Sequence, residues 1–140
     1  MRRVICLAVL LFAATVTNSH AEDATQPFPV PIYDTPRMVF FGPQSAVVSD
    51  KANSVLEFAV QIAAHYQATV EQVTAYCDTA EIAAGSCETL ARRRGEAVKA
   101  ALLRLGLKAR IRVRISTEQL APPGYHEIPA LNRRVVVEPL

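Results

Sequence analysis

The chain has 140 residues, of which 51% are apolar, so it can form one hydrophobic core and one small domain. Its 15 basic and 13 acidic side chains give a formal net charge of +2 at pH 7. This near balance excludes the strongly basic composition by which many proteins attract the phosphates of nucleic acids.

The first 21 residues have the three parts of a secretory signal peptide. Arg2 and Arg3 form a basic start, residues 4–16 form an apolar run, and Ser19 and Ala21 are small residues at the two positions that a signal peptidase reads. We predict cleavage after Ala21. The alternative is an uncleaved anchor, although the run is short for a membrane span. Cleavage would remove two basic residues and leave 13 basic against 13 acidic side chains, so the exported chain would be formally neutral.

Cleavage would also remove Cys6 and leave Cys77 and Cys87. A pair of cysteines in an exported protein forms a disulfide more often than it provides a reactive thiol, so we predict a bond between them. This bond would close a short loop around Asp78, with a stabilisation of roughly 3 kcal/mol. A zinc site formed by the two cysteines and one histidine is the alternative, but the close cysteine pairs of structural zinc are absent from the sequence.

A proline-rich segment over residues 22–36 follows the predicted cleavage site. It has few large side chains, a composition that favours extended, polyproline-like conformations, and we predict that it is a tether. The predicted domain covers residues 37–140. Its first element is a short apolar run over residues 37–41, and Gly42 and Pro43 after it are typical of a turn that closes a strand.

Periodic apolar residues then predict two helices and three further strands. Ser49 is a typical N-cap for a helix whose apolar residues recur at helical spacing over residues 52–63. A second helix over residues 88–105 is expected to stop at Gly106, where left-handed backbone is favourable. The strands are expected over residues 69–76, 108–115 and 134–138.

The strand expected over residues 108–115 alternates without error between apolar and basic side chains. Such alternation is typical of a sheet with one buried and one solvated face. We expect the basic side chains to be solvated, with contact to an anionic polymer as the alternative; they are Lys108, Arg110, Arg112 and Arg114. The order of elements indicates an α/β (α+β) two-layer sandwich, β-α-β-α-β-β, with helices on one face of a mixed sheet.

Arg94 lies near the centre of the apolar stripe of the second predicted helix, because the 3.6-residue period places it among the core-facing residues. A guanidinium on such a surface is costly unless an acceptor meets it, so either an internal acid or a ligand must pair with it. Asp78 is the nearest acid by sequence. A structural salt bridge between Arg94 and Asp78, without a ligand, is therefore the alternative to a binding site.

The sequence shows no catalytic machinery. His65 and His126 would remain after cleavage, and neither lies in a pattern that pairs a nucleophile with a base. Cys77 and Cys87 are too far apart for a Cys-x-x-Cys redox motif. We therefore expect no enzymatic activity, no cofactor and no metal.

Four motifs together resemble the OmpA-like C-terminal domain family over roughly residues 39–137. They are FGPQS at residues 41–45, VTAYCDT at 73–79, LARRRGEAV at 90–98 and NRRV at 132–135. They are similar, in that order, to the family's opening Phe-Asp-Phe-Asp-Ser, its strand ending in Gly-His-Thr-Asp, its Leu-Ser-x-x-Arg-Ala-x-x-Val helix and its Asn-Arg-Arg-Val closing motif. Each motif alone is weak, but their order and spacing are specific.

The resemblance implies a non-enzymatic, peptidoglycan-binding module in the periplasm of a Gram-negative envelope, with outer-membrane association as a further expectation. In the family, the helix arginine and the loop aspartate grip the meso-diaminopimelate of the peptidoglycan stem peptide. Carried over, Arg94 would hold the ligand carboxylate in a bidentate fork and Asp78 would hold the ammonium. Of Arg133 and Arg134, one is expected to face the site and the other to face solvent.

The chain also departs from the family pattern. Gly42 and Gln44 replace the opening acids, Ala75 replaces the glycine before the loop, and Cys87 replaces the asparagine that leads into the helix. The predicted disulfide would then help to re-form the site. The alternative function is a degenerate OmpA-like domain that binds no ligand and acts as an envelope protein-interaction module. With either function, another envelope protein is a further candidate partner, bound through the N-terminal segment.

Overall fold

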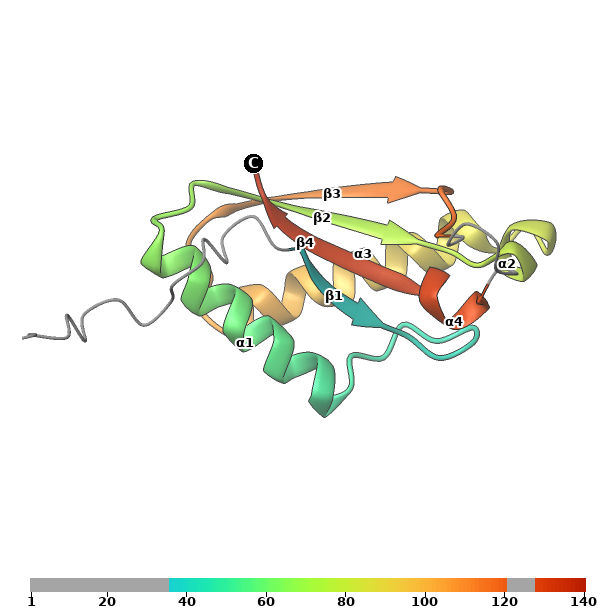
Figure 1. The fold of residues 1–140 in the computed structure, drawn as a ribbon, viewed down its shortest axis with the longest axis horizontal. Helices are drawn as coiled ribbons and strands as arrows, with labels where there is room; N and C mark the ends of the chain where they lie inside the picture. Colours follow the sequence, from blue (N-terminus) through green and yellow to red (C-terminus); the bar gives the residue numbers. More distant parts are fainter. Residues whose placement is uncertain (1–35, 121–127) are drawn as a thin grey trace, which may run out of the picture.

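A computed structural model describes residues 36–120 and 128–140 (Figure 1). The predicted signal peptide, its cleavage site and all but the last residue of the predicted tether lie outside the described residues. No helix in the described part of the chain is long and apolar enough to span a bilayer.

Four strands form one mixed sheet with the spatial order β1-β4-β2-β3. The strands are β1 (Arg37–Phe40), β2 (Val70–Tyr76), β3 (Arg110–Ser116) and β4 (Arg134–Pro139). β2 and β3 are parallel, whereas β4 is antiparallel to both β1 and β2. The last strand therefore lies in the middle of the sheet, and β3 forms one edge.

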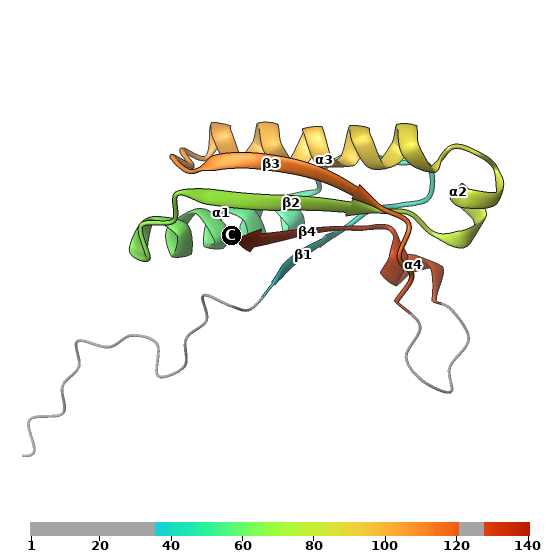
Figure 2. The same cartoon turned by 90° about the horizontal axis from the view of Figure 1, so that it is seen from above.

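Two long helices, α1 (Asp50–His65) and α3 (Cys87–Arg104), cover the same face of the sheet (Figure 2). This arrangement confirms the predicted two-layer α/β sandwich. Two short helices, α2 (Thr79–Ala83) and α4 (Pro129–Asn132), contact each other at the end of the sheet where β2 and β3 finish. Neither short helix is predicted by the sequence pattern.

α1 begins and α3 ends where the sequence predicts. The Ser49 side-chain oxygen accepts a hydrogen bond of 3.2 Å from the backbone N–H of Ala52, which caps α1. Gly106 has a positive φ of 92° directly after the C-cap of α3, a conformation that glycine adopts without steric cost. The apolar stripes of both helices then pack on the strand residues that point toward them, including the fully buried Val73, Val135 and Val137.

The alternation predicted for β3 is confirmed. Ile111, Val113 and Ile115 are half-buried and pack against the core, while the arginines between them are exposed. β3 therefore has one face under α3 and one face open to solvent.

Gly95 allows α3 to approach the sheet closely. A Cβ atom at this position would lie 2.7 Å from Cγ1 of Val113, closer than side chains tolerate. In Gly95→Ala we expect the overpacking cost to exceed the gain in helix propensity, with a net loss of about 1 kcal/mol in the free energy of unfolding. Urea denaturation measures this loss. Ala100→Ser, on the exposed side of the same helix, is the control, and a Gly95→Ala protein more stable than wild type would contradict the prediction.

Candidate ligand-binding site at the end of the sheet

The predicted site residues come from three separate segments that the fold brings to one end of the sheet. Asp78 follows the carboxyl end of β2 and is the N-cap of α2, Arg94 lies on α3, and Arg133 follows α4. Figures 1 and 2 show α2 and α4 at this end, beside the first turns of α3.

Arg94 is completely buried, and its guanidinium is paired with the carboxylate of Glu81 on α2. The two N–H···O contacts run from Nη1 to Oε2 at 2.8 Å and from Nη2 to Oε1 at 2.6 Å. This is the bidentate fork by which arginine binds a planar carboxylate. Glu81 is itself only 2% exposed, so both charges are removed from solvent.

Backbone carbonyls accept the remaining hydrogen bonds of Arg94. Its Nε donates to the Ser45 carbonyl at 2.9 Å, Nη1 donates to the Tyr76 carbonyl at 3.3 Å, and Nη2 donates to the Gly42 carbonyl at 3.3 Å. Together with the two bonds to Glu81, these contacts use all five N–H donors of the guanidinium. Another carboxylate can therefore bind Arg94 in a fork only if Glu81 moves away.

The alternative interpretation, a structural salt bridge between Arg94 and Asp78, is wrong, because the partner of Arg94 is Glu81. Asp78 is turned toward the start of α2, where its Oδ1 accepts a hydrogen bond of 2.7 Å from the backbone N–H of Glu81. The Glu81 carboxylate reaches back to the backbone N–H of Asp78 at 3.2 Å, which completes a capping box. Asp78 therefore caps α2, and the same capping box positions the Glu81 carboxylate beside Arg94.

Asp78 has a second partner in Arg133. The Arg133 Nη1 lies 2.8 Å from Asp78 Oδ2, and the two side chains are 13% and 5% exposed. Burial by itself would raise the pKa of Asp78, but the pKa is lowered overall by the hydrogen bonds from Arg133 and from the Glu81 N–H and by the charges of Arg133 and Arg94. Asp78 is therefore ionised at neutral pH.

Arg134 is buried and the Arg133 side chain is only 13% exposed, so the prediction that one of the two arginines would face solvent is wrong. The Arg134 guanidinium carbon lies 3.7 Å from the centre of the Tyr76 ring, and its Nη1 donates to Asn132 Oδ1 at 3.0 Å. Only 4% of the residue is exposed, and this burial lowers its pKa. Arg133 is the arginine that contacts Asp78, whereas Arg134 holds α4 against the end of β2.

A disulfide joins Cys77 to Cys87, as predicted, with the two Cα atoms 5.5 Å apart. It connects the residue after β2 to the first residue of α3 and encloses α2. Asp78 and Glu81 therefore lie on a covalently closed loop, and Arg94 lies on the helix at its far end. The described residues contain no cluster of acidic, cysteine and histidine side chains suited to a metal ion.

The family model of the OmpA family matches residues 40–122. The chain belongs to the OmpA family. No curated protein sequence matches it significantly.

Solved structures with similarity to this OmpA-family chain support the same fold. The peptidoglycan-associated lipoprotein from Burkholderia pseudomallei is 26% identical, with a TM-score of 0.60 over 73% of this chain and 88% of that chain. The OmpA-like domain of FopA1 from Francisella tularensis subsp. tularensis SCHU S4 is 20% identical, with a TM-score of 0.63 over 74% and 72%. The cell wall anchor of the T6SS from Pseudomonas aeruginosa is 23% identical, with a TM-score of 0.55 over 69% and 71%.

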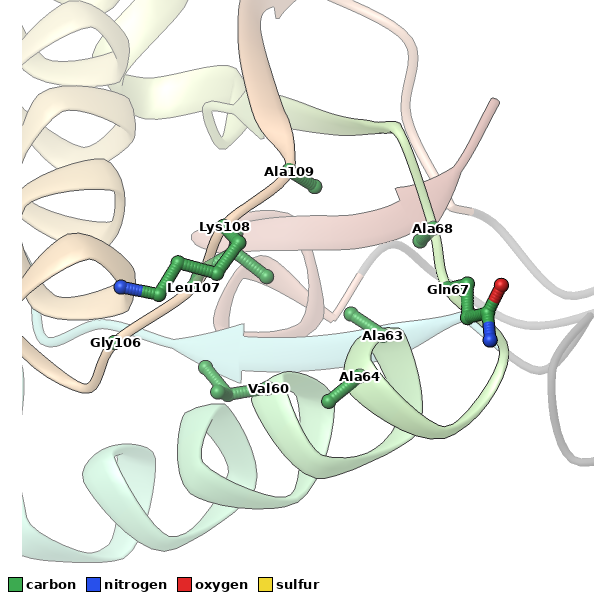
Figure 3. A pocket seen from close by; sticks show the side chains of 9 residues that line it. All are labelled: Val60, Ala63, Ala64, Gln67, Ala68, Gly106, Leu107, Lys108 and Ala109. Carbon is green, nitrogen blue, oxygen red and sulfur yellow. The ribbon is translucent and has the colours of Figure 1, made fainter.

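One cavity of this OmpA-family domain lies far from the charged cluster. Its volume is about 310 Å³, and Figure 3 shows it between the last turns of α1 and the turn that leads into β3. Small side chains such as Ala63, Ala64 and Ala109 line most of it, and Lys108 is its one charged residue. This end of the sheet is opposite to α2 and α4, so the cavity is not part of the candidate site.

The lowered pKa of Asp78 predicts how the free energy of unfolding of the OmpA-family domain depends on pH in acid. Because the folded-state pKa lies below the usual value of 3.8, the carboxylate stabilises the fold fully above that value, and this contribution is lost as the pH falls through the folded-state pKa. In Asp78→Asn, which keeps an N-cap acceptor, we expect lower stability at neutral pH and no difference from wild type in strong acid. Urea denaturation across pH tests this, and a constant difference at every pH would contradict it.

Proposed function

We propose that the chain is a non-enzymatic peptidoglycan-binding module of the Gram-negative cell envelope that grips the diaminopimelate of the stem peptide. Its membership of the OmpA family supports this function, as does its similarity to a peptidoglycan-associated lipoprotein over most of that chain. The predicted signal peptide supports a location in the periplasm. Membership of the OmpA family supports the further proposal of association with the outer membrane.

The observation that carries the proposal is the bidentate pair of Arg94 and Glu81. It supports a carboxylate-binding role for Arg94, because the guanidinium already holds a planar carboxylate in a fork and three backbone carbonyls accept its other hydrogen bonds. Diaminopimelate carries a carboxylate and an ammonium on one carbon. We propose that its carboxylate replaces the Glu81 side chain on Arg94, while Asp78 accepts the ammonium.

Arg133 then has to share Asp78 with the ligand. It lies at the rim of the site. Its side chain is more exposed than those of Arg94, Glu81 and Asp78, so it can turn toward a second anionic group of the stem peptide. We propose Arg133 as the ligand-contacting arginine of the closing motif. Arg134 supports the site indirectly, because it packs on the Tyr76 ring and donates hydrogen bonds to Leu131 and Asn132 of α4.

The ion pair of Arg94 and Glu81 also favours a second candidate function. If Glu81 never leaves Arg94, the ion pair is purely structural, and the domain is the ligand-free protein-interaction module of the alternative prediction. Burial of both charges and the use of all five donors favour this candidate. The two functions therefore differ in whether a ligand carboxylate can displace Glu81.

A pull-down on purified diaminopimelate-type sacculi separates the two functions. We expect wild type to be retained, Asp78→Asn and Arg133→Gln to lose most of this retention, and Arg93→Gln, an exposed change on α3, to behave as wild type. Each variant is first shown to be folded by circular dichroism. No retention of wild type, or equal retention of all four proteins, would overturn the proposed site.

Glu81→Gln provides the sharper comparison because it removes the competing charge and keeps the side-chain length. If a ligand carboxylate has to displace Glu81, folded Glu81→Gln should be retained more strongly than wild type, by roughly tenfold in affinity. If the pair is only structural, neither protein should be retained.

A further inference from the structure

Among the residues that the structure describes, the outer edge of β3 is open. β3 pairs with β2 through all seven of its residues, and within residues 36–120 and 128–140 no strand pairs with its other side. Its outward-pointing backbone N–H and C=O groups are therefore available over a length of roughly 23 Å. An extended segment from another protein could add to the sheet here as a further strand.

A row of cations follows the same strand. Lys108, Arg110, Arg112 and Arg114 are all exposed and alternate with core-facing residues, so neighbouring charges are roughly 7 Å apart. The β2 residues paired with the three arginines are uncharged: Val70, Gln72 and Thr74. In the described part of the chain, the salt bridges involve other cations, namely those of Arg92, Arg94, Lys99 and Arg133.

The charges determine which strand could bind. A second copy of β3 would place arginines beside arginines, and like charges on neighbouring strands are destabilising. A flat anionic surface could neutralise the row of cations but would leave the backbone edge of β3 unpaired. An extended peptide with acidic residues at alternate positions satisfies both features, since its backbone pairs with β3 and its acidic side chains lie beside the arginines.

We propose that the open edge of β3 binds an acidic, extended segment of a partner protein by strand addition. The acidic residues of that segment lie on the open face beside Arg110, Arg112 and Arg114, and small or apolar residues alternate with them on the side of Ile111 and Val113. The proposal uses none of the residues proposed to bind peptidoglycan. Its success or failure is therefore independent of the proposed function.

Fluorescence anisotropy of labelled synthetic peptides tests the proposal on the exported full-length chain. The probe is a nine-residue peptide that alternates glutamate and threonine. One matched peptide carries glutamine in place of glutamate, and another carries N-methyl groups at every backbone nitrogen, so that neither edge can donate, and keeps all its charges. The protein variant is Arg110→Gln with Arg112→Gln, and its control is Arg92→Gln with Arg93→Gln on the exposed side of α3.

The proposal expects saturable binding of the glutamate peptide, weakened by roughly tenfold in the β3 double variant and in the glutamine peptide, and unchanged in the α3 control. N-methylation should abolish binding because it blocks strand pairing. Equal binding of the N-methylated peptide would overturn strand addition. Absence of binding to the glutamate peptide would also overturn the proposal. Phosphatidylglycerol vesicles are titrated separately, and binding of the vesicles without binding of the peptide would likewise overturn it.

Discussion

Replacing Glu81 by alanine should lower the free energy of unfolding by about 3 to 5 kcal/mol, because it leaves the buried guanidinium of Arg94 without a counter-charge. The substitution also removes one half of the capping box of α2. Urea denaturation at neutral pH measures the loss. This is the largest effect we expect from a single substitution at the site.

Glu88→Ala is the matched control for this prediction. Glu88 also forms a salt bridge with an arginine, at 2.8 Å from Arg92, but the two side chains are 77% and 62% exposed. An exposed pair one helical turn apart contributes only about 0.3 to 0.5 kcal/mol. If Glu81→Ala and Glu88→Ala were equally mild, Arg94 would not depend on Glu81, and the structural role given to the buried pair would be wrong.

Loss of the disulfide between Cys77 and Cys87 should cost roughly 3 kcal/mol, because reduction restores conformational freedom to the unfolded chain over a loop of this length. The bond also ties the ends of the segment that carries Asp78 and Glu81. We therefore expect reduction to weaken retention on sacculi as well. Urea denaturation and sacculus binding, each with and without reductant, measure the two effects.

A double variant, Cys77→Ala with Cys87→Ala, is the control, because reductant should not change its stability. A count of free thiols in the unfolded, unreduced exported protein gives an independent check. Two free thiols would remove the disulfide from the account. Binding that does not change on reduction would limit the bond to stabilising the fold.

Most of the fold can be predicted from the sequence because its larger elements have clear periodicity. The apolar stripes of α1 and α3, the Ser49 cap and the strict alternation of β3 all predict elements that the structure confirms. α2 and α4 have only five and four residues, too few to display a helical period. Both therefore escape prediction, although they position the charged residues of the site.

Arg94 could be identified from sequence because a cation in the middle of an apolar stripe requires a partner. The identity of that partner could not be inferred from proximity along the chain. The pattern Asp78-x-x-Glu81 is a capping-box signature, and it was the signal by which Glu81 could have been found. A carboxylate that belongs to a capping box faces back toward the helix start, and here that direction also leads to Arg94.

Arg134 shows a different limit of sequence patterns. The first four residues of β4 are all buried, so the strand has no alternation that would assign its side chains to a core or a solvent face. The burial of Arg134 depends on its contacts with Tyr76 and α4. The sequence pattern does not predict α4. Only the tertiary structure separates the role of Arg134 from that of Arg133.

The central claim is that the fork of Arg94 binds the carboxylate of diaminopimelate in exchange for Glu81. Soluble stem peptides that contain either diaminopimelate or lysine test it most directly, since the two residues differ by one carboxylate. Calorimetric titration should give an affinity at least roughly tenfold higher for the diaminopimelate peptide, and the Nε–H resonance of Arg94 should shift on its addition. Equal affinity for the two peptides, or an Arg94 resonance that does not move at saturation, would contradict the claim.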